Sequence, residues 1–67
     1  MIKEGSIITA NTDHFDEEFG DLYIEKGDKF KVIEHNITTI RIRPIDEHKY
    51  AGEIDIVSRE EFFNEVH

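Results

Sequence analysis

The chain has 67 residues, with 8 Lys and Arg against 16 Asp and Glu, so its formal net charge is −8 with His neutral. It contains no Cys, which excludes a disulfide framework, a thiolate nucleophile and a thiolate zinc site. The length predicts a single domain over residues 1–67, and the acidic balance argues against direct binding to nucleic acid or to an anionic membrane. Apolar runs reach only two or three residues, so we expect no membrane-spanning helix and no signal peptide, and therefore a cytoplasmic protein.

Short β-strand patterns separated by turn residues follow one another along most of the chain. Residues 11–20 are polar and acidic and end in Gly, which predicts a long loop. The Lys-Gly-Asp of residues 26–28 and residues 46–49 predict turns, and the His-Asn of residues 35–36 suits a two-residue hairpin turn because Asn tolerates positive φ. Pro44 should end a strand or lie at a sheet edge. The expected strands are residues 6–10, 21–25, 29–34, 37–43 and 50–57.

Apolar and charged residues alternate along the clearest of these strand patterns. Within residues 29–34, Phe30 and Val32 fall on one face and two lysines fall on the other. This period of two is typical of a strand with one buried face. The residues predicted to point inward are Ile8, Phe30, Val32, Ile40, Ile42, Ile54 and Ile56.

The last residues change from a strand period to a helical one. Ser58 and Glu61 have the spacing of a capping box, which predicts one or two helical turns over residues 59–65. On such a helix Phe62 and Phe63 diverge by about 100°, so one ring covers the open end of the sheet while the other faces elsewhere. An exposed Phe would favour a homodimer. The alternative is that both rings straddle one hydrophobic edge.

The order of these elements resembles a Src-homology-3-like (SH3-like) barrel. Residues 21–34, Asp-Leu-Tyr-Ile-Glu-Lys-Gly-Asp-Lys-Phe-Lys-Val-Ile-Glu, are similar to the segment in which an apolar residue leads into a Lys-Gly-Asp diverging turn and an alternating strand. Residues 7–15 would hold the first strand and the start of the first loop, residues 52–57 the last hairpin strand, and residues 58–66 would replace the usual short helical turn. The resemblance implies a mainly β fold, a small five-stranded SH3-like barrel with a long acidic first loop and a short C-terminal helix.

The chain lacks the aromatic residues with which SH3 domains hold proline-rich peptides. Residues 7–12 contain no Tyr, the sequence contains no Trp, and residues 57–60 contain neither Pro nor Tyr. A polyproline helix needs aromatic grooves for its rings. We therefore expect the fold without that ligand.

The acidic residues are concentrated in the first 25 and the last 22 residues of the chain. Residues 1–25 carry 7 acids and 1 base, residues 26–45 carry 2 acids and 5 bases, and residues 46–67 carry 7 acids and 2 bases. Such a surface either keeps the protein soluble or meets a basic partner. The densest run has no base among its members, Asp13, Asp16, Glu17, Glu18, Asp21 and Glu25.

The spacing of carboxylates on a strand is compatible with imitation of DNA. Glu53 and Asp55 are two residues apart, which places their carboxylates roughly 6.5–7 Å apart on one face, similar to consecutive phosphates of one DNA strand. Arg41 and Arg43 are expected to pair with these two acids across the sheet. In size, acidity and lack of a catalytic set the chain resembles acidic bacteriophage host-takeover proteins that mimic DNA.

These features together predict a non-enzymatic inhibitor of the phage DNA-mimic type. Its partner would be a basic protein, plausibly a host nucleoid-associated or transcription protein in the bacterial cytoplasm, whose DNA-binding surface it blocks. The alternatives are an SH3-like protein-interaction module without polyproline specificity, in which acidity serves solubility only, and a small regulatory enzyme subunit. The predicted partner-binding residues are Asp13, Asp16, Glu17, Glu18, Asp21, Glu25, Asp46, Glu47, Glu53 and Asp55, and Phe62 and Phe63 are the dimer candidates.

Catalytic and metal-binding patterns are not apparent. The four His, at positions 14, 35, 48 and 67, form no His-x-x-x-His pair. Residues 13–18 lack the alternating acids and central Gly of a calcium loop. Ser6 and Ser58 have no His within predictable reach. We therefore expect no enzyme, no metal and no cofactor.

Overall fold

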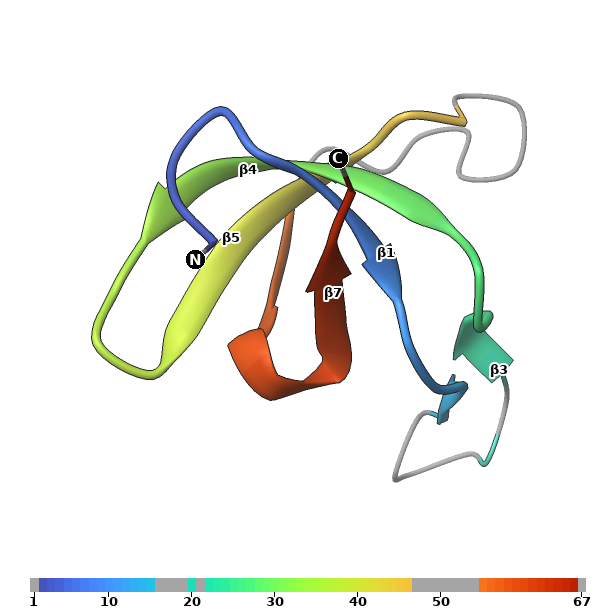
Figure 1. The fold of residues 1–67 in the computed structure, drawn as a ribbon. Helices are drawn as coiled ribbons and strands as arrows, with labels where there is room; N and C mark the ends of the chain where they lie inside the picture. Colours follow the sequence, from blue (N-terminus) through green and yellow to red (C-terminus); the bar gives the residue numbers. More distant parts are fainter. Residues whose placement is uncertain (1, 16–19, 21, 47–54, 67) are drawn as a thin grey trace.

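The computed structural model describes residues 2–15, 20, 22–46 and 55–66, and over these residues the protein is mainly β. In this part of the chain five strands form an antiparallel sheet in the order β6-β5-β4-β1-β7, and two further strands form the separate antiparallel pair β2-β3 (Figure 1). The elements are β1 (Ile7–Ala10), β2 (His14–Phe15), β3 (Leu22–Ile24), β4 (Lys29–His35), β5 (Thr39–Pro44), β6 (Ile56–Arg59), the 3-10 turn η1 (Glu60–Phe62) and β7 (Phe63–Glu65).

The alternation predicted for the central strands is confirmed. In β4 Phe30 and Val32 are buried while Lys29 and Lys31 are exposed. β5 repeats the pattern, with its two isoleucines buried and its two arginines exposed. Phe30 lies opposite Ile8 of β1 on one side and a β5 residue on the other, so the middle of β4 is enclosed by strands on both sides.

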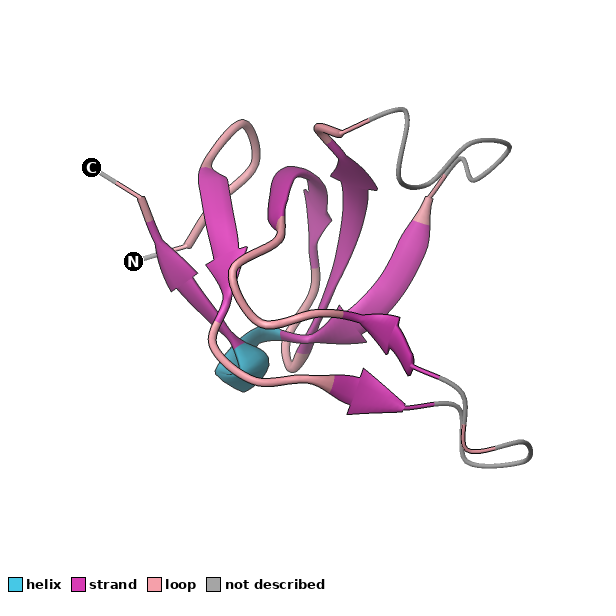
Figure 2. Ribbon diagram, turned by 90° about the vertical axis from the view of Figure 1, so that its right-hand side faces the viewer, coloured by secondary structure: helices cyan, strands magenta, loops and turns pink. Residues whose placement is uncertain are grey.

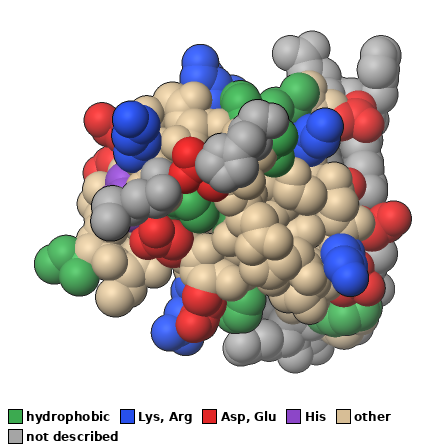
Figure 3. Space-filling view, in the orientation of Figure 1, with side chains coloured by type: hydrophobic (Ala, Val, Ile, Leu, Met, Phe, Trp, Pro, Cys, Tyr) green, Lys and Arg blue, Asp and Glu red, His purple; other side chains and the backbone are tan. Residues whose placement is uncertain are grey.

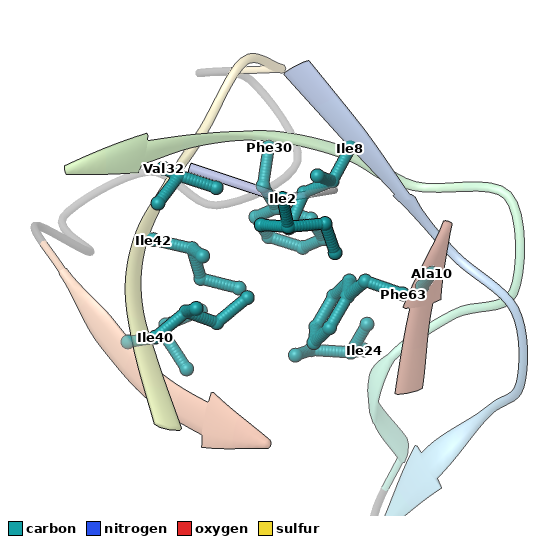
Figure 4. Close-up of a cluster of buried hydrophobic side chains, with 10 residues drawn as sticks. Ile2, Ile8, Ala10, Ile24, Phe30, Val32, Ile40, Ile42 and Phe63 are labelled. Atoms are coloured by element: carbon teal, nitrogen blue, oxygen red, sulfur yellow. The ribbon is translucent and has the colours of Figure 1, made fainter. Parts of the chain in front are cut away.

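One hydrophobic core is enclosed by the curved strands (Figure 4). The predicted inward positions are buried in every case that the structure describes, whereas Ile54 lies outside the described residues. Phe30 meets Phe63 edge to face, with ring centroids 5.8 Å apart. The core consists of Ile2, Ile8, Ala10, Ile24, Phe30, Val32, Ile40, Ile42, Ile56 and Phe63.

The turn at residues 26–28 and the end of β5 agree with prediction, whereas the β4–β5 hairpin differs. Gly27 has φ +96°, and the N–H of Asp28 donates to the carbonyl of Glu25 at 3.0 Å, as in a turn that requires positive φ at its third residue. Pro44 is the last residue of β5. In the hairpin the N–H of Asn36 donates to the carbonyl of Thr39 at 2.9 Å, and no non-Gly residue among those described has positive φ. The predicted two-residue turn is therefore wrong, and residues 36–38 make the connection.

The C-terminal helix predicted for residues 59–65 is wrong. Ser58 lies in β6 opposite Ile40 instead of capping a helix. Arg59 takes the N-cap position and makes no side-chain capping bond. Only a single 3-10 turn, η1, follows before the chain extends into β7.

The free edge of β1 explains this difference. β7 pairs with β1 in antiparallel register, with Phe63 opposite Ala10 and Asn64 opposite Thr9. A helix of seven residues is marginal in water, and it would leave without partners the N–H and C=O groups on the edge of β1 that faces away from β4. The strand satisfies these groups and buries the Phe63 side chain, which is 4% exposed.

The β2-β3 pair extends away from the main sheet, and η1 lies near the chain that connects β1 to β2 (Figure 2). The predicted strand over residues 21–25 corresponds to β3, whereas β2 lies in the segment predicted as a loop. The register shifts between His14 and Phe15. Over the described ranges no helix has the length and apolarity that a membrane crossing requires.

Candidate functional site

A pocket lies where the β2-β3 pair meets η1. Its volume is about 380 Å³, within the range of roughly 300–1,000 Å³ that small-ligand pockets occupy. Residues 12–15 and Tyr23, which lie before and after residues 16–21 in the chain, and Phe62 of the C-terminal turn contribute to it. The lining residues are Thr12, Asp13, His14, Phe15, Tyr23 and Phe62.

One wall of the pocket is fixed by the glycine turn that follows β3. The Oδ1 atom of Asp13 accepts a hydrogen bond from the N–H of Lys26 at 2.8 Å. The N–H of Gly27 donates to the carbonyl of Ala10, and the N–H of Ala10 donates to the carbonyl of Asp28, each at 2.9 Å. Two of these bonds join Ala10 at the end of β1 to the turn, and the third joins Asp13 to it, so the carboxylate of Asp13 is held beside the pocket.

Asn11 fixes the opposite wall by binding η1 and β7. Its N–H donates to the carbonyl of Phe62 at 2.9 Å. Its side-chain Nδ2 lies 3.1 Å from the carbonyl oxygen of Glu61 and 3.3 Å from Oδ1 of Asn64. One residue at the end of β1 therefore holds the turn that presents the Phe62 ring.

His14 lies between the pocket and the core. Its ring meets Phe62 nearly at right angles, with centroids 4.8 Å apart, and lies 5.5 Å from the ring of Phe63. The Nε2 atom is buried and has no hydrogen-bond partner among the described residues. Burial lowers the pKa of His14, and the carboxylate of Asp13 acts in the opposite direction. The lowered pKa favours the neutral form of the imidazole in the folded protein.

Two aromatic rings of the pocket are open to solvent. Phe15 is 57% exposed and Tyr23 is 45% exposed. Both belong to the small β2-β3 pair and not to the curved main sheet. Exposed rings next to a pocket provide apolar faces that a bound side chain can cover.

The structure places four of the ten predicted partner-binding acids. Asp13 lines the pocket, and Glu25 and Asp46 are exposed. Asp55 is bound by Arg43, whose Nε lies 3.2 Å from its Oδ1, as predicted. The remaining predicted acids, which lie outside the described residues, are Asp16, Glu17, Glu18, Asp21, Glu47 and Glu53.

The outer face of the sheet is less acidic than the composition suggests. Arg41 pairs with Glu34 of β4, at 3.8 Å between Nε and Oε2, while the expected partner Glu53 lies outside the described residues. On the face seen in Figure 3, acidic and basic side chains of the described residues are interspersed. Of the net charge of −8, −5 belongs to residues outside the described ranges. The described residues therefore carry a net charge of only −3.

Phe62 and Phe63, the dimer candidates, differ in burial, and neither is an exposed ring. Phe63 belongs to the core, and Phe62 is partly buried and packs against it. Neither ring is among the exposed large apolar side chains of the described residues. The homodimer remains a prediction, and this pair of rings offers it no exposed anchor.

Sequence reasoning missed the aromatic part of the pocket. The sequence pattern predicts only a loop at Phe15 and a strand at Tyr23, although two aromatic residues that flank acidic residues are a usable signal. The sequence gives no such signal for Phe62 as a lining residue of the pocket, because Phe62 is distant in sequence from the other lining residues. In the part of the chain that the structure covers, no group of three or more His, Asp or Glu could hold a metal ion.

Comparisons of the chain with protein-family models, with curated proteins and with solved structures found no match.

Proposed function

We propose that the chain is a non-enzymatic acidic protein that binds the basic, nucleic-acid-binding surface of another protein and thereby excludes DNA. The observation that carries the proposal is the charge of residues 11–25, which hold six carboxylates and no Lys or Arg. These carboxylates repel one another, so their clustering does not stabilise the fold. Their combined charge does raise the rate and selectivity of association with a basic surface.

The described ends of this segment support a role at the surface. His14 of β2 is paired with Ile24 of β3, and Asp13 is hydrogen-bonded to the backbone of Lys26. The two ends of the acidic segment therefore lie side by side on a fixed base. A rigid base lowers the entropy lost when a charged segment meets its partner.

The finer fold that we propose is a small SH3-like barrel. The strand order β6-β5-β4-β1-β7, the glycine turn before β4 and the 3-10 turn between β6 and β7 support this arrangement. A barrel of this kind would present the acidic segment from one end of a compact scaffold. The partner that we propose is a bacterial nucleoid-associated or transcription protein, with the chain acting as an inhibitor of the phage takeover type.

An SH3-like interaction module without polyproline specificity is the second candidate. The pocket with the exposed rings of Phe15 and Tyr23 favours it, because these rings would bury apolar surface of a peptide. The two candidates differ in their response to salt. Binding through charges weakens strongly between low and high salt, whereas binding through an apolar groove weakens little.

A competition assay tests the proposal. The protein is titrated into preformed complexes of DNA with several basic bacterial nucleoid proteins and with RNA polymerase, and DNA release is followed. The variant Asp16→Asn, Glu17→Gln, Glu18→Gln keeps side-chain shape and removes three charges. We expect the parent to release DNA and the variant to release much less, mainly through slower association.

A control variant with the same change in net charge separates local from overall acidity. Glu4, Glu34 and Glu61 are exposed, and their replacement by Gln leaves residues 11–25 unchanged. This control should release DNA nearly as well as the parent. If the parent releases no DNA from any of these complexes, the proposal is wrong. If the loop variant equals the parent, the acidic segment is not the interface.

A further inference from the structure

We infer that the pocket between the β2-β3 pair and η1 binds the side chain of an arginine from a basic partner. The inference rests on the proposed function, because it names the side chain of the partner that enters this site. The charge of the acidic segment would attract the partner, and the pocket would hold one residue of it.

The chemistry of the lining fits a cation with a flat apolar face. Phe15, Tyr23 and Phe62 supply three aromatic rings, and Asp13 supplies a carboxylate. No Lys or Arg is among the described lining residues, and the lowered pKa of His14 favours its uncharged form. Aromatic faces attract cations through the ring quadrupole, and a carboxylate beside them adds a charge-assisted hydrogen bond.

Asp13 is already oriented for this contact. Its Oδ1 accepts the backbone N–H of Lys26 at 2.8 Å, which restrains this oxygen, and the carboxylate has a second acceptor in Oδ2. A guanidinium presents several N–H donors in one plane while its faces stack on rings. The ammonium of a lysine is a compact, strongly hydrated charge and makes less use of the rings.

Other occupants fit this lining less well. An apolar side chain would cover the rings and desolvate the Asp13 carboxylate without pairing it, which is unfavourable. An anion would be repelled by Asp13 and by the acids that follow it in residues 16–25. Arginine uses both parts of the pocket, and it is abundant on surfaces that contact nucleic acid phosphates.

A peptide titration followed by NMR tests the inference. The probe is the capped tripeptide acetyl-Gly-Arg-Gly-amide, compared with the lysine peptide and with a citrulline peptide, which has nearly the shape of arginine but no charge. We expect the arginine peptide to shift the ring signals of Phe15, Tyr23 and Phe62. Binding of the citrulline peptide should be about 5–10-fold weaker, and the lysine peptide should fall between the two.

Matched variants identify the groups responsible. Asp13→Asn keeps an acceptor for the Lys26 N–H and removes the charge, so arginine binding should fall by about 3–10-fold while citrulline binding is unchanged. Tyr23→Leu removes one ring from a position that is 45% exposed, so the fold should persist and binding of all the peptides should weaken. Ile37→Ala, at the hairpin tip where the side chain is 96% exposed, should leave binding unchanged.

The two proposals fail separately in these experiments. Equal binding of the arginine and citrulline peptides, or shifts that avoid the three rings, would overturn the arginine site even if the protein still displaces DNA. Binding of the arginine peptide at the rings supports the site, and it does so even if no DNA is displaced in the competition assay, a result that would refute only the proposed function.

Discussion

Phe62 and Phe63 are adjacent in sequence and differ in burial, so truncating each of them tests the C-terminal strand. Phe63 is 4% exposed and packs edge to face on Phe30, with ring centroids 5.8 Å apart. Phe62 is only partly buried, packs on the outside of the core and meets His14 at 4.8 Å. In β7 the Phe63 side chain points into the sheet interior, whereas Phe62 ends the turn before it.

The expected losses of stability follow from these positions. Truncating a buried Phe to Ala costs about 3–5 kcal/mol, and a domain of this length has a total stability of roughly 3–10 kcal/mol. Phe63→Ala should therefore remove a large part of this stability, while Phe63→Leu should lose about 1–2 kcal/mol. Phe62→Ala should lose about 1–2 kcal/mol, because less of its surface leaves water on folding.

Urea unfolding monitored by far-ultraviolet circular dichroism measures these differences. The urea midpoints of the parent, Phe63→Leu, Phe63→Ala and Phe62→Ala show at which of the two positions truncation costs more stability. If Phe62→Ala destabilises the protein more than Phe63→Ala, the inward direction of Phe63 is wrong. The same conclusion would follow if Phe63→Ala had the midpoint of the parent.

Two further predictions concern the glycine turn and the histidine of the pocket. Gly27→Ala should lower the free energy of unfolding by about 1–2 kcal/mol, because its φ is +96° while no atom would touch the added Cβ; a thermal midpoint equal to that of the parent would contradict this backbone conformation. Since burial lowers the pKa of His14, the unfolded chain takes up this proton more readily than the folded protein. The contribution of His14 should be fully present above its unfolded pKa of about 6.5 and decrease as the pH falls toward the folded value. NMR titration of the His14 ring checks the direction, and His14→Gln should reduce the dependence of the urea midpoint on pH over that range; an equal dependence in parent and variant would show that other groups cause it.

The central strands and most of the core could be predicted from the sequence because their signal is local. Along residues 29–32 two lysines alternate with Phe30 and Val32, and a strand turns these two apolar side chains to one face whatever surrounds it. The glycine turn at residues 26–28 is local in the same sense, since positive φ at its third residue is accessible to Gly at little cost. The β4–β5 hairpin differs from the prediction because several connections suit the same short polar sequence, and the pairing of His35 with Ile40 places His35 within β4.

The conformation of residues 59–65 was decided by tertiary structure alone. Their sequence satisfies the local rules for a short helix, with a capping-box spacing and acids in the first turn. The energy of one or two helical turns is small, whereas pairing with β1 provides hydrogen bonds to a free strand edge and a core position for Phe63. Pairing with β1 stabilises the protein more than a short helix would, so residues 63–65 form a strand.

The sequence by itself determined the acidity of residues 11–25, the absence of Cys and the alternation of the central strands. Only the tertiary structure decided that Asp13, Tyr23 and Phe62 share one pocket. The contacts that assemble it include the hydrogen bonds from Asn11 to Glu61 and Asn64, which lie 50 and 53 positions later in the chain. No local pattern encodes such contacts, because they exist only once the sheet has brought the end of β1 against η1 and β7.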